Sequence, residues 1–106
     1  MLDKLRSLFP LARYRVEGES MSPAVAAGER VLVNRLAYRR GNPRSGDLVV
    51  VRDPRDGSRL LLKRIDRETG DGRWLVLGDN AQASTDSREF GAVERGQIVG
   101  KVWLRY

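Results

Sequence analysis

The residues of this chain whose types and spacing best suit covalent chemistry are Ser20 and Lys63. Ser20 lies in the stretch Gly18-Glu19-Ser20-Met21-Ser22-Pro23. Because glycine is free in φ and proline is fixed in φ, the backbone is expected to turn sharply there and to expose the serine hydroxyl. Serine between glycine and proline is also typical of an ordinary surface turn. The stretch alone therefore leaves two interpretations open, a nucleophile and a plain turn.

Lys63 lies within the apolar run Leu60-Leu61-Leu62-Lys63-Arg64-Ile65. In a strand, alternate side chains point to one face, so Lys63 is expected to share a face with Leu61 and Ile65. Burial lowers a lysine pKa from about 10.4 and makes the neutral amine available near neutral pH, which arginine cannot offer. The alternative is a lysine whose stem covers apolar surface while its head reaches water.

A neutral Lys63 amine close to Ser20 would make a nucleophile and its base. The amine would accept the hydroxyl proton as the oxygen attacks a carbonyl, and would return it to the leaving amine. Backbone N–H groups around Ser20 would stabilise the oxyanion. The chain has no histidine and no cysteine, which excludes thiol nucleophiles, disulfides, the usual zinc sites and imidazole triads. We expect no metal and no cofactor.

Length and charge limit the classes of protein further. The 106 residues suit one domain over residues 1–106, and the formal net charge is +6, which fits nucleic acid or an anionic membrane. Both signs are spread along the chain, as on a solvated basic surface. A basic β-barrel that binds nucleic acid is the competing, non-enzymatic class. Its stacking groups would be only Tyr14, Tyr38 and Trp74, so we expect no nucleic-acid partner.

The first dozen residues have apolar positions at nearly helical spacing. Residues 1–12 are therefore expected to form a short amphipathic helix that ends near Pro10. It is too short and too charged to cross a bilayer and lacks the pattern of a secretion signal. It would cap the core, or lie on a partner or a membrane surface. The absence of cysteine fits a reducing cytoplasm, where we expect the protein, with a peripheral membrane location as the alternative.

The rest of the chain has the pattern of short strands separated by turn residues. The expected strands are Tyr14 to Val16, Arg30 to Asn34, Leu48 to Arg52, Leu60 to Asp66, Trp74 to Leu77 and Ile98 to Leu104. They predict a mainly β fold, a compact coiled antiparallel sheet or small barrel. The polar segment from Asn80 to Val93 is long for a loop in a compact domain, and such loops are often functional.

Three motifs together resemble the boxes of the type I signal peptidases, which are serine endopeptidases with a Ser-Lys dyad. The motifs are Ser20-Met21-Ser22-Pro23, Leu62-Lys63-Arg64-Ile65, and Gly78-Asp79-Asn80 followed by Ser84-Thr85-Asp86-Ser87-Arg88-Glu89-Phe90-Gly91-Ala92-Val93. The resemblance extends from about Val16 to the C-terminus. It implies the β-rich catalytic core shared with the self-cleaving LexA-type repressors, and a precursor protein or peptide as substrate.

The resemblance also implies roles for the matching residues. Ser20 would be the nucleophile, Lys63 the general base, and Ser84 the serine that orients the lysine. Asp86 and Arg88 would brace the loop as an ion pair. Further matching residues would pack beside the nucleophile and contact the substrate (Met21), or would shape the site through the backbone (Gly18, Pro23, Gly78, Asp79 and Asn80).

Two features depart from the exporting signal peptidases. Gly18 stands where those enzymes often carry a hydroxyl residue as oxyanion donor, so the donor here is expected to be backbone. Only 14 residues lie between Lys63 and Gly78, which leaves no room for a large insertion. A short core of this kind most resembles the nickel-type superoxide dismutase maturation proteases, which implies removal of a leader from the dismutase precursor. The alternatives are signal-peptidase-like processing of exported proteins and a LexA-like domain that cuts its own chain.

Overall fold

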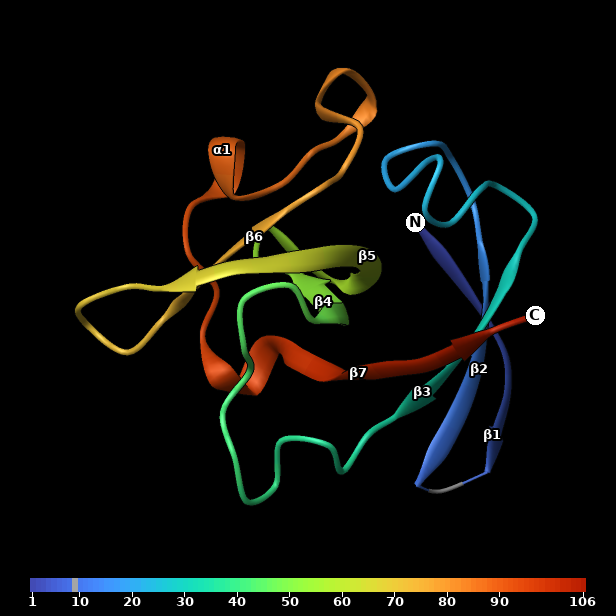
Figure 1. Cartoon of the computed structure of the whole chain (residues 1–106), viewed down its shortest axis with the longest axis horizontal. Coiled ribbons are helices and arrows are strands. Elements are labelled where there is room, and N and C mark those ends of the chain that lie inside the picture. Colours follow the sequence, from blue (N-terminus) through green and yellow to red (C-terminus); the bar gives the residue numbers. More distant parts are fainter. Residues whose placement is uncertain (9) are drawn as a thin grey trace.

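The computed structural model describes residues 1–8 and 10–106. Within them, seven strands form one antiparallel sheet with the spatial order β1-β2-β3-β7-β4-β5-β6, and the sheet curls strongly on itself (Figure 1). The prediction of a mainly β fold with a coiled antiparallel sheet is confirmed. The strands are β1 (Leu2–Leu8), β2 (Leu11–Val16), β3 (Arg30–Asn34), β4 (Leu48–Asp53), β5 (Asp56–Glu68), β6 (Trp74–Leu77) and β7 (Ile98–Arg105).

All six strands expected from the sequence are present, and β5 extends further than expected at both ends. The segment between β6 and β7 contains three short helical turns. They are the 3₁₀ turn η1 (Ala81–Ala83), the one-turn helix α1 (Ser87–Phe90) and the 3₁₀ turn η2 (Arg95–Gln97). No helix in the described ranges is long and apolar enough to cross a membrane.

The helix expected over residues 1–12 is wrong, because this segment forms the hairpin of β1 and β2. Leu2 pairs with Val16 and Leu8 pairs with Leu11. A helix of so few residues before Pro10 is marginal in water, whereas the hairpin gives the backbone of both segments hydrogen-bond partners. Leu2 is buried. Leu5 is exposed and lies where the register of the β1–β2 pair shifts, between Lys4 and Arg6. Phe9, which also belonged to the expected helix, lies outside the described residues.

The curled sheet encloses one cluster of apolar side chains and packs a second cluster against its other face. Strand β4 serves both, since Val50 belongs to the first cluster while Val49 and Val51 belong to the second. A strand buried on both faces reads as a continuous apolar run, as β4 does. On β5, Leu62 joins the first cluster, and Leu61 and Ile65 join the second. This is the alternation expected from the sequence.

The pairing of β5 brings later parts of the chain beside Lys63. Strand β4 pairs along β5, with Val49 opposite Lys63. Strand β6 pairs only with the second half of β5 and ends at Leu77, opposite Arg64. The chain therefore leaves β6 next to Lys63, and the polar segment that follows is placed over this side chain.

Candidate active site

Ser20 lies in the turn that follows β2. Gly18 has a φ of +83°, a conformation that glycine adopts readily and other residues rarely do, and the Ser22–Pro23 peptide is cis. The Ser22 N–H donates to the Glu19 carbonyl (3.1 Å), and the Val25 N–H donates to the Met21 carbonyl (2.9 Å). The positive φ of Gly18 and these two hydrogen bonds turn the backbone sharply around Ser20, as the sequence led us to expect.

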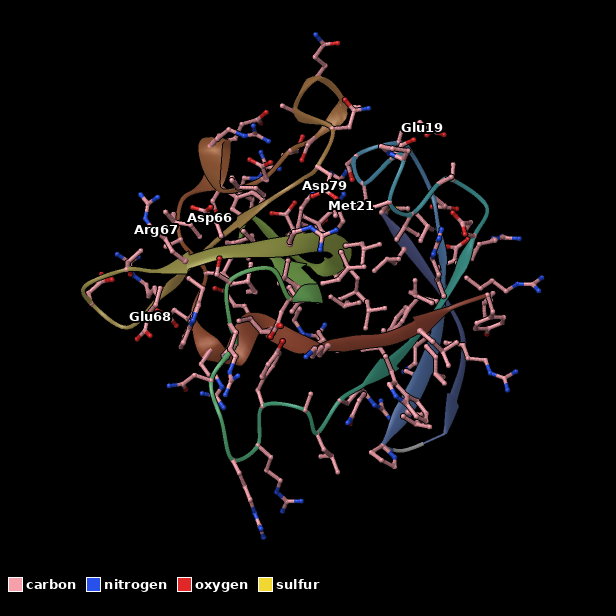
Figure 2. All side chains as sticks on the ribbon, viewed as in Figure 1. Glu19, Met21, Asp66, Arg67, Glu68 and Asp79 are labelled. Atoms are coloured by element: carbon pink, nitrogen blue, oxygen red, sulfur yellow. The ribbon has the colours of Figure 1, made fainter. Side chains whose placement is uncertain are left out.

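Residues from the segment after β6 hold this turn in place. The Asn80 N–H donates to the Ser20 carbonyl (2.8 Å), and the Asn80 side chain donates to the Glu19 carbonyl (3.1 Å). The Asp79 N–H donates to the sulfur of Met21 at 3.4 Å, and Figure 2 shows Met21 and Asp79 side by side. Met21 is fully buried beside Ser20. Its expected contact with the substrate stays a prediction.

Lys63 is a buried side chain, with only 2 % of its surface exposed. Burial lowers the pKa of Lys63 from 10.5 to about 8, against the opposing effect of the Asp86 carboxylate and with the help of the charges of Arg59 and Arg88. A substantial fraction of this amine is therefore neutral at mildly alkaline pH. The alternative of a lysine that reaches into water does not describe this side chain.

Ser84 links Lys63 to a buried carboxylate. The Nζ atom of Lys63 donates to Ser84 Oγ (3.0 Å), and Ser84 Oγ donates to the Oδ2 atom of Asp86 (2.8 Å). Because the serine proton is directed at Asp86, the serine oxygen presents a lone pair to Lys63. Ser84 thus fixes the position of the amine without competing for its lone pair.

Asp86 is fully buried and organises the segment after β6. Its carboxylate accepts from the N–H groups of Gly78 (2.8 Å) and Arg88 (3.0 Å), and from the Arg88 guanidinium through Nε (2.9 Å) and Nη2. The expected ion pair of Asp86 and Arg88 is present. Burial opposes ionisation of Asp86, but these donors outweigh it and hold the carboxyl pKa well below its ordinary value. The carboxylate therefore stays charged across the neutral pH range.

Gly78 is the point of closest approach between these segments. A Cβ atom built on Gly78 would lie 2.0 Å from Ser84 Oγ and 2.9 Å from the Ser20 carbonyl oxygen. Any side chain at this position would therefore displace the serine that holds Lys63. The sequence marked Gly78 only as part of a turn.

Arg64, a residue that the sequence analysis did not single out, fastens β5 to the same segment. Its guanidinium donates to both carboxylate oxygens of Asp79 (2.9 Å each) and to the Gly46 carbonyl (3.0 Å). Bidentate pairs of this kind fix geometry as well as charge. Arg64 points away from Lys63 along the alternating strand, so it positions Asp79 without entering the site.

A pocket of about 290 Å³ brings Ser20 and Lys63 to one cavity. Sequence reasoning placed Leu61 on the face of Lys63 but missed most of the wall, although the same period of two along β5 would have added Arg59 to that face. The lining residues are Met1, Glu17, Gly18, Glu19, Ser20, Arg59, Leu61, Lys63, Ala83 and Thr85. Ser84 and Asp86 do not line this pocket, whereas Ser20 and Lys63 do, so a substrate in it would meet the serine and the lysine together.

Comparison with known proteins adds an independent observation. The family model described as "Signal peptidase, peptidase S26" matches residues 4–71 and 65–106. The mitochondrial ATP-independent inner membrane protease subunit 1a of Arabidopsis thaliana is 41% identical over 112 residues, which cover 85% of this chain and 67% of that protein. Signal peptidase IB of Staphylococcus aureus is 29% identical over 150 residues, which cover 92% of this chain and 78% of that protein.

Proposed function

This chain belongs to the signal peptidase family, and we propose that it is a serine endopeptidase in which Ser20 and Lys63 form the catalytic dyad. The observation that carries the proposal is the burial of a lysine with a lowered pKa in the same pocket as a serine on a sharp turn. Perturbed pKa values in a pocket mark candidate catalytic groups.

The proposed first step is acylation of Ser20. The neutral Lys63 amine accepts the hydroxyl proton as Ser20 Oγ bonds to the carbonyl carbon of the scissile peptide. The C–N bond then breaks, and Lys63 returns the proton to the leaving amine. In the second step Lys63 accepts a proton from the water that attacks the acyl ester. The ester bond to Ser20 Oγ then breaks, the acid product leaves, and Lys63 returns the proton to Ser20 Oγ.

The proposed oxyanion donor is the backbone N–H of Ser20. This N–H has no hydrogen-bond acceptor among the described residues, and Asn80 holds the peptide of Ser20 by its carbonyl. A donor that is fixed before the reaction stabilises the charge that develops on the substrate oxygen. It would replace the hydroxyl that Gly18 cannot supply.

The proposed reaction is removal of an N-terminal leader from a precursor protein. The names of the two relatives, a signal peptidase and a mitochondrial inner membrane protease subunit, support this class of substrate. The specific substrate that we propose is the precursor of nickel-type superoxide dismutase. The proposal is supported by the spacing of the motifs and by the short segment of 14 residues between Lys63 and Gly78. Leaders of exported proteins are the second candidate, supported by the Staphylococcus relative. The cytoplasmic location stays a prediction, since the Arabidopsis relative is named an inner membrane protease.

The test is cleavage of two substrates by the purified protein, with the products identified by mass. One substrate is the dismutase precursor, and the other is an export-type leader that ends in Ala-x-Ala. We expect the dismutase leader to be removed at one bond, and Ser20→Ala to abolish this. Cleavage of the export leader alone would replace the proposed substrate, and activity retained by Ser20→Ala would refute the dyad.

A further inference from the structure

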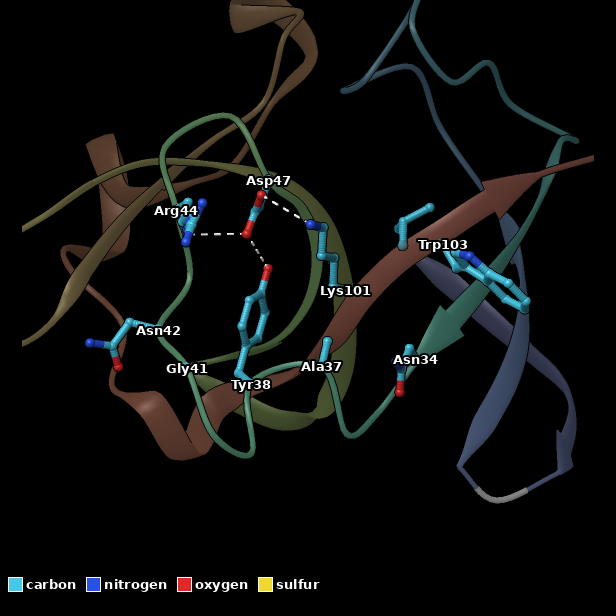
Figure 3. Close-up of a pocket in the computed structure, with 10 residues that line it drawn as sticks. Asn34, Ala37, Tyr38, Gly41, Asn42, Arg44, Asp47, Lys101 and Trp103 are labelled. Carbon is cyan, nitrogen blue, oxygen red and sulfur yellow. Dashed lines mark hydrogen bonds and ion pairs between the residues drawn. The ribbon is translucent and has the colours of Figure 1, made fainter.

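A second and larger pocket lies between the β3–β4 connection and β7, away from Ser20. Its volume is about 500 Å³, and none of its lining residues lines the pocket at Ser20. Figure 3 shows Tyr38, Arg44 and Asp47 on one side of Lys101, and Trp103 on the other. The lining residues are Asn34, Ala37, Tyr38, Gly41, Asn42, Arg44, Asp47, Lys101, Val102 and Trp103.

The inner wall of this pocket is held together by Asp47. Its carboxylate accepts from the Tyr38 hydroxyl (2.6 Å) and from the Arg44 N–H (3.0 Å), and forms an ion pair with Lys101 (3.5 Å). These partners neutralise the one acidic group of the lining. The shape of the wall is thus fixed without leaving a net negative charge.

The rim of the pocket, where it adjoins a smaller pocket through Gly41 and Asn42, carries cations without acidic partners. Arg44 lines the larger pocket, and Arg39 and Arg40 line the smaller one. Arg39, Arg40 and Arg44 are exposed, and their guanidinium groups pair with no carboxylate among the described residues, whereas Arg64 and Arg88 do. Arginines that no carboxylate neutralises, gathered along one edge, create a positive field that attracts anionic groups.

The position of that edge is fixed by a contact from η2. Arg95 donates to the Asn42 side-chain oxygen (2.6 Å) and to the Gly41 carbonyl (2.5 Å). The chain that carries the rim arginines is therefore tied to the body of the fold, and less of this segment has to be ordered when a ligand binds.

Trp103 provides the apolar side of the pocket. Its side chain is 66% exposed, while Trp74 is 4% exposed in the core. Exposed tryptophan is costly to leave in water and is enriched in binding surfaces. A ligand that suits this pocket therefore combines an apolar side chain with negative charge.

We propose that this pocket binds an acidic segment of the protein that the enzyme processes, with an apolar side chain of that segment against Trp103 and its carboxylates near Arg39, Arg40 and Arg44. Only the identity of the bound protein rests on the proposed function. Lys101 and Lys63 both pair with Val49, so the two pockets are built on strands separated by one strand, about 10 Å apart. One extended substrate chain can reach both.

A polypeptide fits the pocket better than the other polyanions do. Trp103 is the one exposed aromatic residue of the lining, since Tyr38 is half-buried and its hydroxyl donates to Asp47. One exposed ring provides no series of stacking groups for nucleic acid bases. A concave site of this volume admits a side chain and a short backbone segment, whereas a bilayer presents a broad surface.

The experiment measures binding of a synthetic peptide to the Ser20→Ala protein through Trp103 fluorescence. The peptide carries glutamates around one leucine, and a matched peptide has glutamine in place of each glutamate. We expect the acidic peptide to shift the emission to shorter wavelength and to protect Trp103 from acrylamide, and we expect the neutral peptide to bind at least about tenfold more weakly, which corresponds to ~1.4 kcal/mol.

The matched variants separate the pocket from general electrostatics. Arg39→Gln/Arg40→Gln/Arg44→Gln and Arg13→Gln/Arg30→Gln/Arg67→Gln remove the same charge from exposed arginines. We expect the first variant to lose at least about tenfold in affinity for the acidic peptide and the second to lose less than about threefold, since salt-screened distant charges contribute little.

Three results would overturn the inference. They are equal losses in the two variants, no response of Trp103, and stronger binding of the pocket to phosphatidylserine vesicles or single-stranded DNA than to the peptide. Because the assay uses the Ser20→Ala protein, its outcome does not depend on the dyad. Absent binding with intact cleavage by the wild type would refute only this pocket, and binding without cleavage would refute only the peptidase.

Discussion

The Nζ atom of Lys63 lies 3.0 Å from Ser84 Oγ, which in turn donates to Asp86. Ser84, which contacts the proposed base Lys63, is thus itself held by the buried carboxylate of Asp86. The arrangement orients the amine, and it also ties the proton affinity of Lys63 to the conformation of the segment after β6, because Asp86 opposes the pKa-lowering effect of burial.

Replacement of Lys63 tests the base directly. Lys63→Met is expected to lower kcat/KM by about 10²–10⁴, the usual contribution of a general base. Lys63→Arg is expected to be equally inactive because arginine keeps its proton. The measurement is leader cleavage under steady-state conditions, with circular dichroism as the control for folding. Activity close to wild type in either variant would contradict the assignment.

The rate of cleavage is expected to rise with pH through the pKa of Lys63. Because burial lowers this pKa to about 8, the amine is about one-tenth neutral at pH 7, half neutral at pH 8 and nine-tenths neutral at pH 9. The profile of kcat/KM should therefore increase about ninefold from pH 7 to pH 9. A flat profile over this range would rule out a titrating amine as the base.

Ser84→Ala is expected to reduce kcat by about 10–100-fold, less than Ser20→Ala does, because the base remains and only its orientation is lost. KM should change little, since Ser84 does not line the pocket. The pH profile should also move, because the variant removes a hydrogen bond to Lys63. If Ser84→Ala lowers only the stability of the protein and leaves the pH profile of cleavage unchanged, Ser84 has a purely structural role.

Gly78→Ala is expected to abolish cleavage, since its Cβ would overlap Ser84 Oγ at 2.0 Å. The matched control is Gly96→Ala, because a Cβ atom built on Gly96 has no neighbour within 4 Å. We expect the control to keep at least half of the wild-type rate. The measurement is the rate of leader cleavage by both variants under the same conditions. An active Gly78→Ala protein would show that the segment after β6 can shift without loss of activity.

The free energy of unfolding is also expected to depend on pH because Lys63 is buried. Lys63 in the unfolded chain keeps its proton to about pH 10.4, whereas in the fold its pKa is about 8. Between these values the unfolded state binds more protons, so the free energy of unfolding rises with pH, and below pH 8 the buried ammonium costs the fold about 3 kcal/mol.

Lys63→Met is therefore expected to be more stable than the wild type at pH 7, by up to about 3 kcal/mol, with a gap that narrows above pH 8. Urea unfolding of both proteins across this pH range measures the difference between their free energies of unfolding. Parallel stability curves for the two proteins would show that the lysine pKa is not lowered in the fold.

The sequence predicted those features that depend on local pattern. Alternation along β5 placed Lys63 with Leu61 and Ile65, and Gly18 and Pro23 indicated the turn at Ser20. The helix over residues 1–12 failed because apolar spacing in a short segment does not distinguish a helix from one strand of a hairpin, and the partner strand β2 decided the matter.

Features that depend on long-range pairing were not predictable from one sequence. The place of β7 between β3 and β4, which builds the pocket at Trp103, follows from no local signal. Arg64 reaches Asp79 because β5 and β6 meet in one particular register. Strand registers of this kind are set by the whole core.

The central position of β7 means that the proposed site is complete only when nearly the whole described chain has folded. Asn80 meets Ser20 across 60 positions of the chain, and the sheet that carries both closes only when residues 98–105 insert between β3 and β4. Contacts this remote in sequence tend to form late in folding. The topology therefore makes the proposed site depend on the last strand of the described sheet.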